Sequence, residues 1–172
     1  IMNAPLTVAD VEAAQARIAG RVHRTPLLSS QTLGARIGLG GPVWLKAENL
    51  QKTGSFKVRG ALNNIDLLAD EQKARGVITV SAGNHAQAVA WAAAEAGVAA
   101  TVVMAAAASS IKAAATRGYG AEVILHGANN HEAFAEMHRL REERGLTFVH
   151  PFDSATTVAG TGTVGLELLE DL

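Results

Sequence analysis

Two short segments of this 172-residue sequence carry side chains whose types and spacing could do chemistry. The first runs from Thr53 to Lys57, and Ser55 within it is a suitable N-cap for a helix that places Lys57 in its first turn. The positive end of the helix dipole disfavours an ammonium group there. A lysine in its neutral amine form is a nucleophile toward aldehydes. A solvated surface lysine is the alternative, and position alone favours that alternative.

The second segment runs from Ser81 to His85, Ser-Ala-Gly-Asn-His, and follows the apolar stretch Val77 to Val80. In parallel α/β sheets, ligands bind at the carboxyl ends of strands. A glycine-containing turn that opens a helix there leaves backbone N–H groups free for a carboxylate or a phosphate. An ordinary strand-to-helix turn, capped by Ser81 or Asn84, explains the same residues equally well.

Apolar patterning predicts the elements that position these segments. From Ser55 onward, helical stretches alternate with short, β-branched stretches without polar alternation, which is typical of strands covered by helices on both faces. Right-handed crossovers then give a parallel sheet. Strands are expected at 43–47, 77–80, 100–104, 122–125 and 147–149, and helices at 7–19, 56–69, 84–96, 109–117, 130–144 and 155–172. The predicted fold class is α/β, an open, mostly parallel three-layer sandwich.

Composition excludes several classes of function. Fifteen basic and sixteen acidic residues give a net charge of -1, without the positive excess typical of nucleic-acid binders. The absence of cysteine excludes thiolate metal sites and fits a reducing compartment. Ile1 to Asp10 has no signal-peptide pattern, and the alanine-rich window Val89 to Ala108 predicts a helix and a strand instead of a membrane span. We expect a cytoplasmic protein without nucleic-acid or membrane partners.

Two further patterns suggest other chemistry but lack its context. The glycines at 160, 162 and 165 satisfy the dinucleotide-binding pattern, but a polar segment, 153–158, stands where that pattern requires an apolar strand. The pair His131-Glu132 lacks the second histidine four residues on that a zinc-binding helix needs. We therefore expect neither a nicotinamide site nor a metal site.

Taken together, the two chemical segments resemble one known family. Ser-Phe-Lys-Val-Arg-Gly-Ala around Lys57, followed by Ser-Ala-Gly-Asn-His-Ala-Gln from Ser81, is similar to the threonine dehydratase and serine racemase group of fold-type II (tryptophan synthase β-like) pyridoxal-phosphate enzymes. The similarity extends in family order to 23–27, 48–61, 118–123 and 150–153, and it covers the N-terminal part of the family. It implies a two-domain enzyme in which residues 52–150 form a small α/β domain, while 1–51 and 151–172 begin the large cofactor-binding domain. The glycines at 160–165 would then lie in a closely packed helix.

The resemblance implies pyridoxal 5'-phosphate as the cofactor and a role for each matching residue. Lys57 would hold the cofactor as an imine and then move the α-proton of the substrate. Phe56 would pack against the cofactor ring, and Asn84 would hydrogen-bond the ring hydroxyl oxygen. The carboxylate of a small amino-acid substrate would be bound by the turn that contains Ser81, Ala82, Gly83, Asn84 and His85.

The implied activity is dehydration and deamination of L-threonine, and of L-serine, to 2-oxobutanoate or pyruvate and ammonia. The resemblance further implies a homo-oligomer and a place in amino-acid metabolism such as isoleucine biosynthesis. Serine racemases are the first alternative, but they usually carry a proton-donating serine where this sequence has Ala82. The second alternative is a non-catalytic fragment, since the family's phosphate-binding loop and its contact to the pyridine nitrogen are expected beyond Leu172.

Overall fold

A parallel sheet of four strands forms the centre of the computed structural model, which describes residues 6–172. Residues 1–5, part of the segment without a signal-peptide pattern, lie outside the described residues. The strand order is β5-β4-β3-β6. In chain order these strands are β3 (Val77–Val80), β4 (Ala100–Met104), β5 (Glu122–Leu125) and β6 (Thr147–Phe148). Val77 of β3 is paired with Ala100 of β4 on one side and with Thr147 of β6 on the other, so the carboxyl ends of β3 and β6 lie at the same edge.

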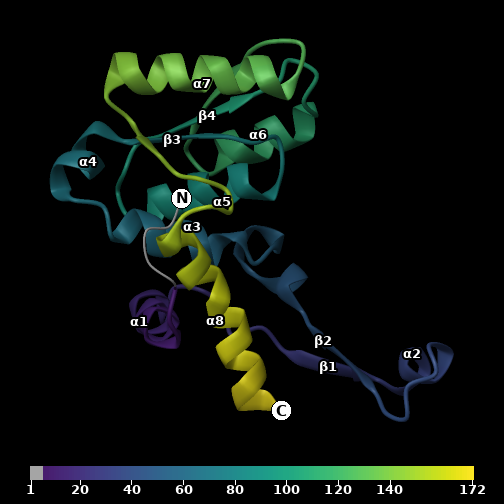
Figure 1. Ribbon diagram of the computed structural model, residues 1–172. Helices are drawn as coiled ribbons and strands as arrows, with labels where there is room; N and C mark the ends of the chain where they lie inside the picture. The colour runs from purple at the N-terminus through teal and green to yellow at the C-terminus, as the bar shows by residue number, and fades with distance from the viewer. Residues whose placement is uncertain (1–5) are drawn as a thin grey trace.

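Helices cover both faces of this sheet, so the fold has three layers (Figure 1). The helices are α1 (Val8–Ile18), α2 (Gln31–Arg36), α3 (Lys57–Asp66), α4 (Asp70–Arg75), α5 (Asn84–Glu95), α6 (Ser110–Gly118), α7 (Asn130–Arg144) and α8 (Ala155–Asp171). On one face, Ile78 and Val103 pack against Met137 of α7. On the other, Val77 and Val102 are buried in a core shared with α3, α5 and α6. The predicted three-layer, parallel α/β fold is confirmed.

The predicted strands 77–80, 100–104 and 122–125 are observed with the same bounds. The predicted helix 56–69 is shorter than expected, because it ends at Asp66 and the separate helix α4 follows. Ala69 N–H donates to Gln72 Oε1 at 3.0 Å, and this contact starts the new helix. The short helix α2 was not predicted. Within residues 6–172, no helix is long and apolar enough to cross a membrane.

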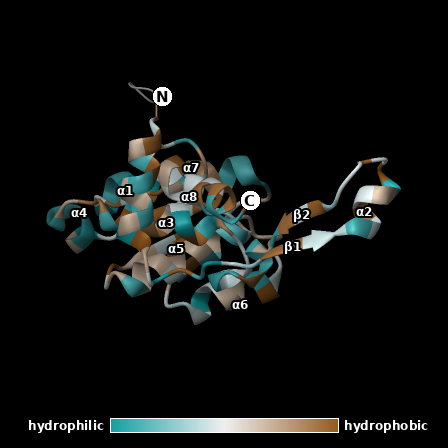
Figure 2. Ribbon diagram, turned by 90° about the horizontal axis from the view of Figure 1, so that it is seen from below, coloured by the Kyte–Doolittle hydropathy of each residue, from teal (hydrophilic) through white to brown (hydrophobic). Residues whose placement is uncertain are grey.

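Outside the sheet, α1 and α8 pack against α3, while an antiparallel hairpin extends away from the body (Figures 1 and 2). The hairpin consists of β1 (Leu27–Ser30) and β2 (Val43–Lys46), with α2 at its tip. Figure 2 shows apolar segments on this arm. They include Leu28, Trp44 and Leu45, each about half exposed.

The helix α8 crosses α3 at very close range, and glycine permits this approach. A Cβ atom added to Gly160 would lie 2.5 Å from the carbonyl oxygen of Arg59 and 2.9 Å from the Cα atom of Gly60. The glycine pattern at 160–165 therefore lies inside a helix and serves helix packing. The prediction of a closely packed helix for this segment is confirmed.

Candidate active site

Lys57 is the first residue of α3 and follows a strained turn. Thr53 has a φ of 57°, and among residues 6–172 it is the one residue other than glycine with a positive φ. Such conformations cost free energy and are concentrated at functional sites. The predicted N-cap was one position wrong: Phe56 occupies that position, where its backbone already has helical angles, and it makes no side-chain cap. The hydroxyl of Ser55 nevertheless accepts a long hydrogen bond, 3.4 Å, from Lys57 N–H.

The amine of Lys57 has a hydrogen-bond partner but no counter-charge. Its Nζ donates to the carbonyl oxygen of Pro151 at 2.9 Å and lies 5.1 Å from the centroid of the Phe56 ring. No carboxylate within residues 6–172 forms an ion pair with it. Burial lowers the pKa of Lys57 below its ordinary value, because a partly desolvated ammonium is disfavoured. The nucleophilic amine form is therefore favoured, in the direction that the sequence indicated, although the cause is burial.

The predicted carboxylate-binding turn borders a cavity of about 480 Å³, lined in part by Ser81, Ala82 and Gly83. We call it the carboxyl-edge cavity, because its other walls come from the carboxyl ends of β3 and β4, from the start of α7 and from neighbouring loops. Its lining residues are Val80–Gly83, Val103–Ala105, Asn130, Phe134 and His150–Phe152. Gly83 occupies the N-cap position of α5, and no side chain caps this helix. The interpretation as a turn capped by Ser81 or Asn84 is therefore wrong, and the first N–H groups of α5 remain available to an anion.

His85 lies beneath this turn and is only 4% exposed. Its Nε2 lies 3.1 Å from the carbonyl oxygen of Val149. Because a carbonyl can only accept, Nε2 carries the proton and Nδ1 is a bare acceptor, which is buried without a partner among residues 6–172. Burial lowers the pKa of His85 to about 4; the bond to Val149 opposes this shift, and the positive charges of Lys57 and His150 add to it. His85 is therefore neutral near pH 7 and offers no charge to a carboxylate.

One loop joins the two predicted segments. Val149 accepts from His85, and Pro151, two residues on, accepts from Lys57. This loop follows β6, which pairs with β3 and so ends at the same edge as the strand before Ser81. Lys57 and the 81–85 turn are thus bound to the same loop, which lines the carboxyl-edge cavity at His150 and Pro151. Phe56 and Asn84 are exposed beside it.

Sequence reasoning missed the part that this loop plays. In the sequence, His150 and Pro151 belong only to the resemblance and show no chemical pattern of their own. A signal was available, because they follow a predicted strand at the same relative position as Ser81 follows β3.

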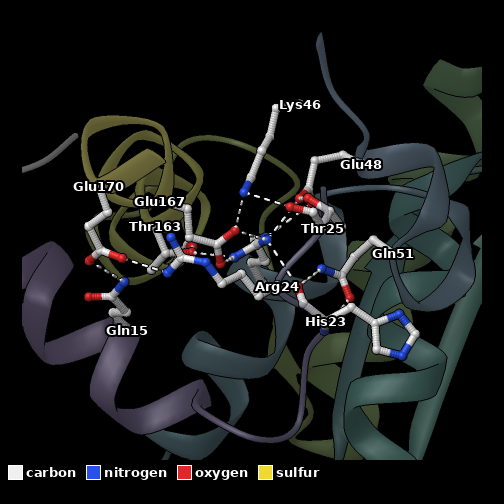
Figure 3. Close-up of polar contacts among 12 residues, drawn as sticks. Gln15, His23, Arg24, Thr25, Lys46, Glu48, Gln51, Thr163, Glu167 and Glu170 are labelled. Atoms are coloured by element: carbon white, nitrogen blue, oxygen red, sulfur yellow. Dashed lines mark hydrogen bonds and ion pairs between the residues drawn. The ribbon is translucent and has the colours of Figure 1, made fainter. Parts of the chain in front are cut away.

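A second polar cluster, also missed, includes Arg59 in the first turn of α3, and Figure 3 shows several of its members. Arg59 is 1% exposed and forms ion pairs with Glu48 at 2.8 Å and Glu167 at 2.6 Å. Lys46 Nζ lies 2.7 Å from Glu167, and Figure 3 shows Lys46, Glu48 and Glu167 converging from separate elements. Arg59, Glu48, Glu167 and Lys46 make up this cluster. We call these four residues the Arg59 network.

The charges of this network stabilise one another. Burial lowers the pKa of Arg59, but hydrogen bonds to Glu48 and Glu167 outweigh it and raise the pKa overall. Burial raises the pKa of Glu167, but hydrogen bonds from Arg59 and Lys46 outweigh it and lower the pKa overall. The Arg59 network therefore connects α3, and with it Lys57, to the end of β2, to the segment just after it and to α8.

The site fits a pyridoxal-phosphate cofactor. It has a lysine amine without a counter-charge, an exposed aromatic ring beside that amine, and a helix start whose N–H groups no side chain caps. The cavity volume, about 480 Å³, lies in the usual range for small-molecule sites. Within residues 6–172, no group of three or more His, Asp or Glu side chains is arranged to hold a metal ion.

Comparison with known proteins identifies the class. Residues 18–172 match the family model described as pyridoxal-phosphate dependent enzyme, and the chain belongs to this family. The resemblance predicted from the sequence is confirmed, and with it pyridoxal phosphate as the cofactor of the family.

Individual relatives are similar along almost the whole chain. The L-threonine dehydratase catabolic TdcB of Staphylococcus aureus (strain N315) is 50% identical over 167 residues, which are 97% of this chain and 48% of the relative. The structure of maize serine racemase has a TM-score of 0.91 at 42% identity and covers 96% of this chain and 50% of that chain. A threonine deaminase from T.th. has a TM-score of 0.86 at 48% identity and covers 95% of this chain and 51% of that one. The chain thus spans about half the length of the relatives that it matches.

Proposed function

We propose that this chain carries the reactive lysine of a threonine ammonia-lyase, which dehydrates and deaminates L-threonine, and L-serine, to a 2-oxo acid and ammonia. One observation carries this proposal above all. The amine of Lys57, whose uncharged form burial favours, is tied to Pro151, on the wall of the same cavity that the uncapped turn at Ser81–Gly83 lines. The similarity to the S. aureus threonine dehydratase supports this choice of substrate.

Bound pyridoxal phosphate supplies the electron sink for the charge that develops at the α-carbon. The protein residues bind, orient and move protons. Lys57 Nζ, whose pKa burial lowers, takes the α-proton as a neutral amine. The free N–H groups at the start of α5, with the hydroxyl of Ser81, bind the substrate carboxylate. Phe56, 38% exposed beside Lys57, is available to pack on the cofactor ring, and the exposed amide of Asn84 is available to the ring hydroxyl oxygen.

His85 has a supporting role in this scheme. Since its ring is neutral and donates to Val149, it holds the loop whose Pro151 carbonyl oxygen positions Lys57. Its contribution to carboxylate binding then comes from its backbone N–H group in the first turn of α5 and not from a charged side chain.

A serine racemase remains the alternative within the family, because maize serine racemase is similar in both sequence and structure. Ala82 argues against it. This residue lines the cavity, and its methyl group has no proton to deliver to the second face of the substrate. A non-catalytic role is the other alternative, and only the bound cofactor and turnover distinguish it.

We also propose the division into a small domain, 52–150, and the beginning of a large domain, 1–51 and 151–172. A cytoplasmic location and a homo-oligomer belong to the same proposal, and the exposed apolar side chains on the β1–β2 arm support contact with another surface. For the metabolic role, isoleucine biosynthesis and catabolism are both open. The name of the S. aureus relative favours catabolism.

The test measures 2-oxobutanoate released from L-threonine by the complete gene product, with and without added pyridoxal phosphate. We expect cofactor-dependent release, and pyruvate release from L-serine. Chiral analysis of serine in the same samples examines the alternative, because D-serine formed faster than pyruvate would identify a racemase. Bound cofactor at one per chain without any product would support the non-catalytic alternative.

A further inference from the structure

His150 is held in one tautomer by its own loop. Its Nδ1 accepts from Phe152 N–H at 3.2 Å and from Asp153 N–H at 2.7 Å. Because two N–H groups point at Nδ1, that nitrogen carries a lone pair and no proton. The proton of the neutral ring is therefore on Nε2. Within residues 6–172, Nε2 has no hydrogen-bond partner.

The orientation of this ring is also fixed. Phe148 and Phe152 pack edge to face against it, with ring centroids 5.5 Å and 4.7 Å from that of His150, a favourable arrangement of aromatic rings. His150 lines the carboxyl-edge cavity, and it forms no ion pair with a carboxylate of residues 6–172. Burial lowers the pKa of His150, although the negative charge of Asp153 opposes the shift, so the ring is neutral near pH 7. A rigid, neutral N–H donor thus borders the cavity.

We propose that His150 is a substrate-binding residue that donates a hydrogen bond from Nε2 to the β-hydroxyl oxygen of the amino-acid substrate. This inference rests on the proposed function, and it names the residue that recognises the hydroxyl group. Neutral imidazole keeps its proton in this contact. The hydrogen bond orients the Cβ–O bond and stabilises the negative charge that builds on the departing oxygen. The departing hydroxyl and the α-proton that Lys57 takes together make up one molecule of water.

The position of His150 next to Pro151 supports this role. The carbonyl oxygen of Pro151 accepts from Lys57 Nζ at 2.9 Å, and Lys57 must approach the substrate α-carbon to take its proton. The turn at Ser81–Gly83, which we propose for the carboxylate, lines the same cavity. A β-hydroxyl is only two bonds from the α-carbon, so the residue that binds it must lie close to the amine that takes the α-proton, and His150 adjoins the residue that holds this amine.

Two substitutions separate the two nitrogen atoms of the ring. In His150→Asn, the amide oxygen can take the place of Nδ1 and accept from the loop, but the Nε2 donor is lost. In His150→Gln, the longer amide can restore a donor near the position of Nε2. The experiment compares both variants with the wild-type holoenzyme on L-threonine and on β-chloro-L-alanine, whose chloride leaves without a hydroxyl to recognise.

We expect kcat/KM of His150→Asn for L-threonine to fall by about tenfold to a hundredfold, the usual effect of losing a hydrogen bond that discriminates a hydroxyl group. The value for β-chloro-L-alanine should remain within about twofold, since the interaction is absent there. Partial recovery with L-threonine in His150→Gln would strengthen the inference. An equal loss for both substrates, which indicates a structural role, or no loss for either, would overturn it.

Binding distinguishes a failure of this inference from a failure of the proposed function. The change in cofactor absorbance is titrated with L-threonine and with L-2-aminobutyrate, which lacks the hydroxyl group. If the wild type produces no 2-oxo acid, the proposed function fails. The inference then still stands if the wild type, but not His150→Asn, prefers L-threonine over L-2-aminobutyrate. An unchanged preference in the variant would overturn it.

Discussion

Lys57 and Arg59 lie in the same turn of α3, separated by one residue, but their surroundings differ in every respect. The amine of Lys57 donates to the carbonyl oxygen of Pro151, a residue that lines the carboxyl-edge cavity, and has no counter-charge. Arg59 faces the opposite side, where Glu48 and Glu167 hold its guanidinium from both ends. The pKa directions are opposite as well: burial lowers the pKa of Lys57, whereas the two carboxylates raise that of Arg59.

The surroundings of Lys57 and Arg59 also differ in whether the nearby buried polar atoms have hydrogen-bond partners. In residues 6–172, two buried side-chain polar atoms lack a partner, Thr53 Oγ1 and His85 Nδ1. Thr53 lies four residues before Lys57. His85 lies in α5, which contacts the turn 52–54. Buried polar groups without partners are costly and therefore rare in stable proteins. On one side of this turn, therefore, the Lys57 amine is left without a counter-charge and near buried polar atoms without partners, while on the other side a paired ionic network holds the helix in place.

Removal of the amine of Lys57, for which we propose the catalytic role, gives the largest expected effect. Lys57→Ala should lower kcat by at least about a thousandfold and abolish the visible absorbance of bound cofactor, because the nucleophile and the proton acceptor are the same group. Product assays and absorbance spectra of the complete gene product measure both. The control is Lys112→Ala, an exposed lysine on α6, which should leave both unchanged. Normal absorbance in Lys57→Ala would place the cofactor on another residue.

The Arg59 network should show its importance in stability. Arg59→Met removes the guanidinium from the buried Glu167 and the partly buried Glu48, and we expect the free energy of unfolding to fall by about 3–5 kcal/mol. Denaturant titration measures it. The matched control is Arg139→Met on α7, since Arg139 also pairs with two carboxylates, Glu136 and Glu143, but is 57% exposed. That variant should be almost as stable as the wild type. Similar losses in both variants would remove the distinction between the buried network and a surface pair.

The contrast between these regions also explains what could be predicted from the sequence. The strands 77–80 and 100–104 were predicted with correct bounds because a strand buried on both faces leaves a continuous apolar run. The helices α2 and α4 could not be assigned in this way, since each is a six-residue helix with no fully developed apolar face. The break after Asp66 depends on a local side-chain contact of Gln72.

At the site, local patterns were enough to select the candidate residues whose proposed roles depend on their own place in the chain. Lys57 and the 81–85 turn each combine a helix start with a suggestive residue type. Contacts over long sequence distances left no such pattern: Pro151 is 94 residues from Lys57, and Glu167 is 108 residues from Arg59. From the sequence, Arg59 was therefore only one more residue of the motif around Lys57. Only tertiary structure shows that it is the anchor of its helix.

The stability of the protein should respond to acid at different pH values for His85, beside the cavity, and for Glu167, in the Arg59 network. The pKa of His85 is about 4 in the folded protein and about 6.5 when unfolded. The unfolded chain therefore binds the proton first as the pH falls, and stability decreases between about pH 6.5 and 4, by about 1.4 kcal/mol per pH unit and on the order of 3 kcal/mol in total. The pKa of Glu167 is lowered in the folded protein. Its contribution to the free energy of unfolding is therefore fully present above pH 4.5, the ordinary pKa of a glutamate, and is lost only below that pH.

Denaturant titrations from pH 7 to pH 4 compare the wild type with His85→Gln, which keeps a donor for Val149 but cannot be protonated. The variant should lose most of the slope above pH 4.5. The exposed His131 on α7 gives the control, and His131→Gln should retain the wild-type slope. If His85→Gln retains it too, His85 is not the group that titrates in this window.

The smallest expected effect concerns the close approach of α8 to α3, near the turn that contains Lys57 and Arg59. In Gly160→Ala, the new Cβ would meet Arg59 O at 2.5 Å and Asn63 Cβ at 2.8 Å, so the helices must separate at a cost of about 1–3 kcal/mol. Gly165→Ala is the control in the same helix, because nothing lies within 4 Å of its Cβ and alanine favours a helix by up to about 1 kcal/mol. Thermal unfolding should therefore shift in opposite directions in the two variants. A stabilised Gly160→Ala would mean that α8 does not pack on the Arg59 side of α3 as closely as the structure has it, and that the anchor of Lys57 lies elsewhere.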